Sequence, residues 1–147
     1  WHEAMKSDKF PILLRYCWFG LNQEFRKKIQ PIALTTVQFT VLRTIHDKLP
    51  QSINQSDLSK LISTNKNNIS AIVKRLHALG YVKISANLFD KREKQISISE
   101  TGIATYLFAK KKADELKLAL FQNFKQSELI SLSQSFKRIS QKADSMK

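Results

Sequence analysis

The 147-residue sequence predicts a mainly α-helical fold that contains one small β-hairpin. Apolar residues recur at spacings of three and four through most of the chain, which is the period of helices with one buried face. Between residues 82 and 99 the spacing changes to two, as in paired strands. Two short helices with a two-residue connection come directly before this hairpin, so we predict a winged helix-turn-helix.

The composition predicts one domain that binds a polyanion. Lys and Arg number 25 against 12 Asp and Glu, which gives a net charge of +13. Such a field favours polyanions. The single cysteine excludes an internal disulfide and a cysteine-based zinc finger, and it fits a reducing cytoplasm. No apolar run approaches membrane-spanning length, so we expect no membrane partner and a cytoplasmic location.

The first predicted helix runs from Asp8 to Lys28 and is apolar on more than one side. A helix of this kind is usually buried on more than one side. Gln30-Pro31 ends it, and a second helix follows from Leu34 to Lys48 with Thr35 or Thr36 as its cap. The apolar residues of the first helix are Phe10, Leu13, Leu14, Tyr16, Cys17, Trp18, Phe19, Leu21 and Phe25.

The two short helices form the predicted helix-turn-helix. Asn54 and Asp57 suit the cap and third position of the first one. Only Ser63 and Thr64 separate it from Asn65, the expected cap of the second helix, so the two helices must cross sharply. The second helix has one apolar face and ends at Gly80, as expected for a left-handed turn. Its apolar residues are Ile69, Ile72, Val73, Leu76 and Leu79.

The opposite face of that second helix is short, polar and cationic. A helix that enters the major groove needs amides that can pair with adenine and cations for phosphates or guanine. The alternative is the solvated face of an ordinary amphipathic helix. We predict DNA contacts from Asn65, Lys66, Asn67, Asn68, Ser70, Ala71, Lys74 and Arg75.

The hairpin that follows has strands near Val82 and Ile98 and a charged tip between Asn87 and Lys94. A hairpin placed directly after such a helix is a wing, although most charged turns of this kind are only solvent-exposed. Residues 54–99 hold eight Lys and Arg against three acids. We predict that the wing contacts DNA through Asp90, Lys91, Arg92 and Lys94.

Two further helices complete the chain. One follows Gly102 and runs to about Asn123, and Ser127 is expected to cap the last one. The last helix repeats apolar residues at spacings of 3-4-3-4-3, which predicts lengthwise packing on another helix. We therefore divide the chain into residues 1–33 and 103–147 for dimerisation and residues 34–102 for DNA binding. The expected homodimer contacts are Phe10, Leu13, Leu132, Phe136, Ile139 and Met146, with packing of the two ends within one chain as the alternative.

The motifs of the winged unit resemble those of the MarR family of bacterial transcriptional regulators. Shared features are Arg75-Leu76, Gly80-Tyr81-Val82, Asp90-Lys91-Arg92, residues 98–102 and the opening at residues 34–39. Thr64 departs from the apolar residue that the family commonly has in the turn. The resemblance implies an intertwined homodimer paired through its first and last helices. It also implies that Arg92 enters the minor groove while Asp90 orients its guanidinium.

A two-fold dimer presents its two recognition helices to successive major grooves, about 34–36 Å apart. We therefore expect binding to a pseudo-palindromic site in double-stranded DNA, with repression as the expected outcome. Asn67 and Asn68 favour adenine, so the operator should be A·T-rich.

The resemblance also implies release from DNA by a small aromatic or phenolic effector, or by cysteine oxidation. Arg15, Tyr16, Trp18 and Phe19 are the candidate lining of the effector cleft, although aromatic stripes are usually core. Cys17 lies on the apolar stripe, where burial would raise its pKa and make it a poor nucleophile. We therefore expect structural packing for Cys17.

Two rival functions remain. An enzyme is disfavoured because the three histidines have no metal-ligand spacing and no phosphate loop or nucleophile elbow is present. We accordingly expect no catalytic residue, no metal and no cofactor. A winged helix used only for protein contacts is the stronger alternative.

Overall fold

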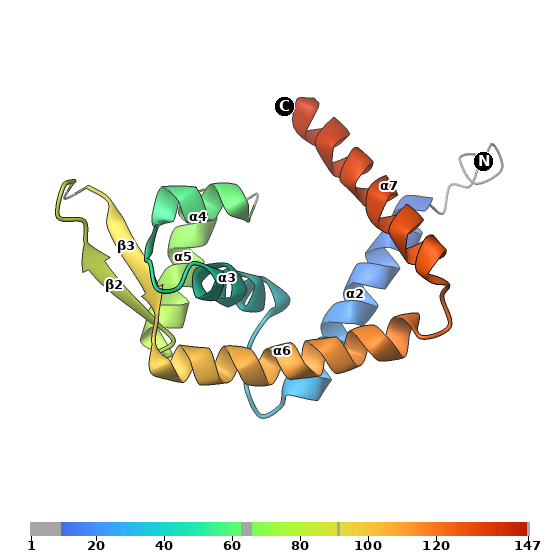
Figure 1. The fold of residues 1–147 in the computed structure, drawn as a ribbon, viewed down its shortest axis with the longest axis horizontal. Coiled ribbons are helices and arrows are strands. Elements are labelled where there is room, and N and C mark those ends of the chain that lie inside the picture. Colours follow the sequence, from blue (N-terminus) through green and yellow to red (C-terminus); the bar gives the residue numbers. More distant parts are fainter. Residues whose placement is uncertain (1–9, 63–65, 91, 147) are drawn as a thin grey trace. The chain divides into compact units, whose positions relative to one another are not determined.

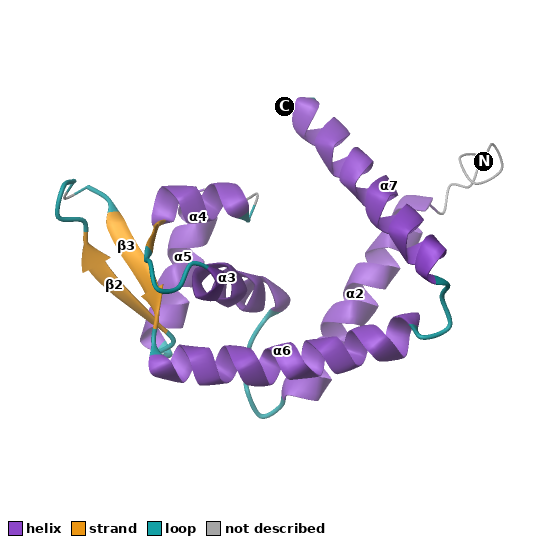
Figure 2. Cartoon of the chain, viewed as in Figure 1, coloured by secondary structure: helices purple, strands orange, loops and turns teal. Residues whose placement is uncertain are grey.

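The structure, a computed structural model, describes residues 10–62, 66–90 and 92–146. Figure 1 and Figure 2 show a mainly helical chain with one small sheet, so the predicted fold class is confirmed. The chain divides within one helix into two units, residues 1–113 and 114–147. The elements are α2 (Phe10–Ile29), α3 (Thr36–Asp47), β1 (Ile53–Asn54), α4 (Gln55–Leu61), α5 (Lys66–Ala78), β2 (Val82–Ala86), β3 (Lys94–Ile98), α6 (Glu100–Phe121) and α7 (Gln126–Ser145).

The core of the first unit lies among α3, α4, α5 and the sheet. Its apolar side chains have lost contact with water, and each contributes about 1.5–3 kcal/mol of transfer free energy when fully buried. This burial holds the recognition helix α5 on the rest of the unit. Its fully buried members include Leu42, Ile45, Leu58, Ile69, Leu76 and Ile96.

Three antiparallel strands form the sheet in the order β1-β3-β2. Val82 pairs with Ile98 and Ile84 with Ile96, so the predicted hairpin is confirmed. These four apolar side chains lie on one face of the sheet. The two-residue strand β1 was not predicted. It pairs Ile53 with Ile96 and adds a third strand on the far side of β3.

Side-chain caps begin α3 and α4. Thr35 is the cap of α3, since its hydroxyl accepts from the Gln38 N–H at 3.1 Å. Asn54 caps α4, with its amide oxygen accepting from the Asp57 N–H at 2.7 Å. Gly80 follows α5 with φ of 80°, as the sequence predicted. The cap expected at Asn65 falls outside the described residues.

A row of aromatic rings joins α2, α3 and α6 within the first unit. The ring centroids of Phe25 and Phe39 lie 5.2 Å apart, and those of Phe39 and Tyr106 lie 5.7 Å apart. His46 continues the row at 4.6 Å from Tyr106. These contacts fix the start of α6 and the end of α2 against the winged unit.

The start of α6 was predicted too late, because the helix begins at Glu100 and includes Gly102. A Cβ on Gly102 would lie 2.0 Å from the carbonyl oxygen of Tyr81, so the glycine permits close packing rather than a helix start. Ser99 occupies the junction, where its hydroxyl donates to the Gly80 carbonyl at 2.6 Å and accepts from the Gly102 N–H at 3.0 Å.

The second unit contains the end of α6 and all of α7. The expected cap at Ser127 is wrong, since α7 begins one residue earlier, at Gln126. Instead the Glu128 carboxylate accepts from the backbone N–H of Lys125 at 3.2 Å. No described residue of α7 is buried within the chain.

Candidate functional site

The recognition helix α5 has one buried and one exposed face. Ile69, Val73 and Leu76 are buried at spacings of four and three. Asn67, Ala71 and Lys74 repeat the same spacing on the other side and are exposed. The helix thus presents an amide, a methyl group and an ammonium group along one face, with no bulky side chain among these three.

The remaining helix residues predicted for DNA contact flank that exposed row. Asn68 and Arg75 are exposed, and Ser70 is half-buried. Lys66 is the first residue of α5, and Asn65 lies outside the described residues.

Backbone hydrogen bonds and two polar side chains build the tip of the wing. The Asn87 amide oxygen accepts from the Phe89 N–H at 2.9 Å, and the Glu93 carbonyl accepts from the Asn87 N–H at 3.1 Å. Asp90 Oδ1 accepts from the backbone N–H of Arg92 at 2.9 Å. These bonds hold residues 87–90 to residues 92–93.

In the chain without DNA, Asp90 has a role within the turn. Its carboxylate lies against the backbone of Arg92 rather than its guanidinium, because an Asp side chain readily closes a turn onto the N–H two residues ahead. Among the described residues no ion pair joins Asp90 to Arg92. Asp90 therefore positions the chain that carries Arg92, and the exposed guanidinium is left available for an outside partner.

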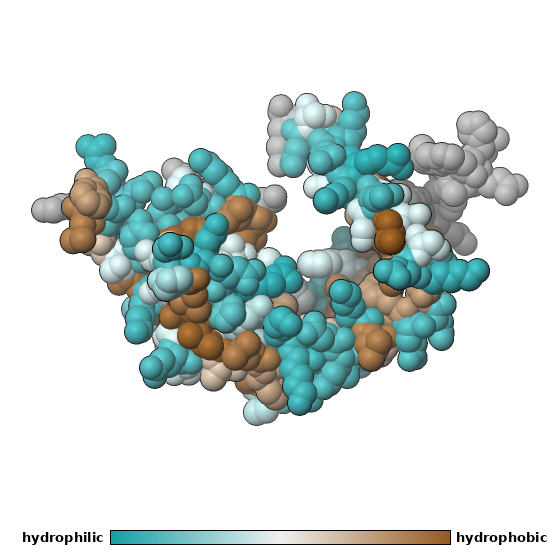
Figure 3. Space-filling view, in the orientation of Figure 1, coloured by the Kyte–Doolittle hydropathy of each residue, from teal (hydrophilic) through white to brown (hydrophobic). Residues whose placement is uncertain are grey.

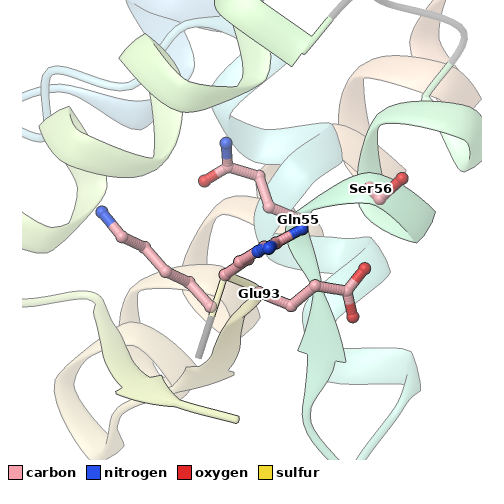
Figure 4. A pocket seen from close by; sticks show the side chains of 5 residues that line it. Gln55, Ser56 and Glu93 are labelled. Carbon is pink, nitrogen blue, oxygen red and sulfur yellow. The ribbon is translucent and has the colours of Figure 1, made fainter. Parts of the chain in front are cut away.

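A shallow hollow of about 190 Å³ lies where the wing meets the start of α4. Arg92 and Lys94 line it from the wing together with Glu93, and Gln55 and Ser56 line it from α4. Figure 4 shows Gln55, Ser56 and Glu93 around this hollow, with the Gln55 amide turned away from the Ser56 hydroxyl and the Glu93 carboxylate. The lining therefore combines two cations with one carboxylate, an amide and a hydroxyl group.

Sequence reasoning missed Gln55 and Ser56. Pairing of β1 with β3 brings them to the wing, with the Ser52 hydroxyl donating to the Gln95 amide oxygen at 2.9 Å. A strand of two residues has no detectable period, so the sequence carried no signal for this contact.

The candidate effector residues Arg15, Tyr16, Trp18 and Phe19 are all exposed on α2. A hollow of about 480 Å³ lies instead at the junction of α2 and α3, with Arg26 and Thr35 in its lining. Cys17 is also exposed, so the expected burial of its thiol is wrong within a single chain. The neighbouring side chains Tyr16, Trp18 and Phe19 are exposed as well, so the apolar stripe on this part of α2 does not bury the thiol.

The candidate dimer residues are likewise exposed. Leu13 and Met146 are 54% and 73% exposed, and Leu132, Phe136 and Ile139 are between 38% and 49% exposed. Phe10 begins α2. Within the described ranges no helix is both long and apolar enough to cross a membrane, and no group of three His, Cys, Asp or Glu gathers as a metal site.

Comparison with known proteins identifies relatives of this chain. Residues 34–93 match the model of the MarR family. The HTH-type transcriptional repressor NicR of Pseudomonas putida is 30% identical over 92 residues, which cover 63% of this chain. The chain spans 57% of the length of NicR.

Solved structures share the fold over nearly the whole chain. BpsR of Bordetella bronchiseptica, whose DNA binding is regulated by 6-hydroxynicotinic acid, is 20% identical with a TM-score of 0.81. That similarity covers 91% of this chain and 94% of BpsR. A mutant MarR of E. coli in complex with operator DNA is also 20% identical with a TM-score of 0.81, over 92% of this chain and 96% of that one.

Proposed function

We propose that this chain is a MarR-family transcriptional regulator that binds double-stranded DNA as a homodimer, and the match of residues 34–93 to the model of that family supports this. The observation that carries the proposal is the exposed polar face of α5, backed by a buried apolar face and flanked by the exposed cations of the wing. Relatives with this fold are named as regulators and not as enzymes. A regulator of this kind works in the bacterial cytoplasm.

Each part of the interface has a distinct role in this proposal. Asn67 and Asn68 pair with adenine edges in the major groove, which favours an A·T-rich operator. Lys74 and Arg75 bind phosphates and fix the register of the helix. Arg92 enters the adjacent minor groove, where a narrow A·T tract concentrates negative potential. The net charge of +13 supports steering toward DNA.

The proposed homodimer explains the exposed apolar surface of α2 and α7. Trp18 and Phe19 are 57% and 61% exposed in the single chain, and Phe136 is 46% exposed. Large exposed apolar patches of this kind mark interaction surfaces. With its two recognition helices about 34–36 Å apart, the dimer binds a pseudo-palindromic operator and represses transcription.

The proposed effector is a small aromatic acid or phenol. BpsR, with the same fold, is regulated by 6-hydroxynicotinic acid. The exposed aromatic side chains Tyr16, Trp18 and Phe19 supply stacking surface, and Arg15 supplies a cation for a carboxylate. Release of bound DNA by 6-hydroxynicotinic acid, with a weaker response in Arg15→Ala, tests this assignment.

The test of the proposed function is a titration of duplex DNA, selected from random sequence, at two salt concentrations. We expect tight binding with a steep salt dependence and a preference for the selected duplex over a scrambled one. Arg92→Ala should weaken binding to the selected duplex by about 1–3 kcal/mol, since it removes a groove contact.

Lys137→Ala, which removes an exposed cation from α7, is the matched control and should bind normally. Equal binding of the selected and scrambled duplexes would favour a winged helix that serves protein contacts instead.

A further inference from the structure

We propose that Leu88 and Phe89, at the tip of the wing, pack against the deoxyribose walls of the minor groove that Arg92 enters. The inference rests on the proposed function and deepens it, because it assigns an apolar part to a contact described so far only by charge. At the tip of the wing the Arg92 guanidinium then contacts the floor of the groove, and the two apolar side chains contact its walls.

The first observation is the exposure of this pair. Leu88 is 94% exposed and Phe89 is 98% exposed, which makes them the two most exposed large apolar side chains in the described part of the chain. The next most exposed, Met146 and Leu118, are 73% and 68% exposed. Figure 3 shows the resulting hydrophobic patch at the end of the hairpin, at the left of the view.

The second observation is that the turn does not need this pair for its own structure. The Asn87 side chain and the carbonyls of Asp90 and Glu93 make the hydrogen bonds that close the turn. Leu88 contributes no side-chain contact to this closure, and Phe89 contributes only its backbone N–H. Polar residues at both positions would serve the turn equally well, so the apolar side chains have an outside partner to contact.

The charge around the pair identifies that partner as DNA. Phe89 is three residues before Arg92, whose guanidinium is exposed, and Lys94 is exposed at the base of the same turn. Residues 87–94 carry three cations against two acids, so the tip has a net charge of +1, which fits a polyanion. The two apolar side chains together are far too small for a stable protein interface. Proteins that bind the minor groove combine Arg or Lys with apolar side chains such as Leu and Phe in this way.

The experiment compares wild type with a Leu88→Ser and Phe89→Ser double variant on the selected duplex, over a series of salt concentrations. We expect the variant to bind on the order of tenfold more weakly, because it has no apolar side chains to bury against the walls of the groove. The slope of log affinity against log salt should stay unchanged, because no phosphate contact is lost. Arg92→Ala, by contrast, removes a cation and should change the slope.

A second duplex locates the contact. Replacing guanine by inosine in the flanks of the site removes the amino group that fills the minor groove and leaves the major-groove acceptors in place. Wild type should gain affinity from this replacement, and the double variant should gain less. An equal gain for the two proteins would contradict a contact in the groove.

Leu49→Ser is the matched control, since it removes a side chain that is 42% exposed outside the wing. It should bind like wild type. Both Ser variants are surface changes, so their unfolding midpoints check that the fold is intact.

Unchanged affinity of the double variant overturns the inference while leaving the proposed function in place. A change in oligomeric state of the double variant would also overturn it, since the pair would then contact a second copy of the chain. Failure of wild type to bind any duplex would instead remove the proposed function.

Discussion

Apolar residues are mostly buried in the winged unit, whereas on the two outer helices, α2 and α7, they are mostly exposed. In the winged unit Leu42, Leu58 and Leu76 are completely buried by neighbours in the same chain. Among the side chains of α2 from Ile12 to Ile29 only Phe25 and Ile29 are buried, and on α7 no described residue is buried. The same kind of helical period therefore leads to burial in one region and to exposure in the other.

The difference shows that amphipathic spacing specifies a helix and one apolar face, but not the element that covers this face. In the winged unit short connections bring α3, α4, α5 and the sheet together, so each apolar face meets another within the chain. For α2 and α7 we propose that a second copy supplies the cover. The stability of the winged unit should then be independent of protein concentration, whereas the stability of α2 and α7 should depend on it.

The largest expected effect is a loss of core packing in the winged unit. Leu76→Ala removes a completely buried side chain from the recognition helix, and it should lower the free energy of unfolding by about 2–5 kcal/mol. Urea unfolding, followed by the far-UV signal, measures this loss. The loss should be the same at high and low protein concentration, because the cavity lies within one chain.

Leu132→Ala is the matched control on α7, where the side chain is 38% exposed in the single chain. Its cost should shrink as the protein is diluted below the dissociation constant of the dimer. Equal losses for both variants at the lowest concentration would remove the distinction between the two regions.

The winged unit could be predicted from sequence because its signals are local. Thr35 and Asn54 cap their helices where Ser, Thr and Asn residues are expected to do so, and Gly80 takes the left-handed turn that ends α5. The alternation of apolar residues near Val82 and near Ile98 predicted the two paired strands. The caps and the helix end depend on residues only a few positions apart in the chain. The hairpin depends on the single turn that joins its two strands.

The features that were missed depend on contacts between distant residues. The sequence predicts a helix that follows Gly102, whereas Gly102 lies within α6, where the Tyr81 carbonyl approaches it closely. Strand β1 forms only because β3 offers an edge. Cys17 was expected to be buried because its stripe is apolar, but burial there needs a covering surface that the sequence of one chain does not specify.

The second effect concerns the apolar seam of α7. Leu132→Asp combined with Phe136→Asp places two carboxylates in the proposed interface. Burial of unpaired charge is costly, so the dissociation constant of the dimer should rise at least about 100-fold. Sedimentation equilibrium measures this constant directly, and the stability of the winged unit should not change.

Gln134→Asp combined with Gln141→Asp adds the same charge at exposed positions across the helix from the seam. This pair should leave the dimer intact. A wild type that stays monomeric at working concentrations, or equal effects of the two pairs, would show that α7 does not dimerise through this seam.

The smallest expected effect is the change in stability when a single methyl group is added to a glycine in each region. In α2 a Cβ on Gly20 would meet no atom within 4 Å, so Gly20→Ala should stabilise the chain by up to about 1 kcal/mol through its higher helix propensity. Gly102→Ala makes the same chemical change in α6 but forces a Cβ to within 2.0 Å of the Tyr81 carbonyl oxygen, so it should destabilise. Thermal unfolding of the two variants, at a dilution where the wild type is monomeric, measures both signs. A loss of stability at Gly20 under those conditions would mean that α2 packs against its own chain after all.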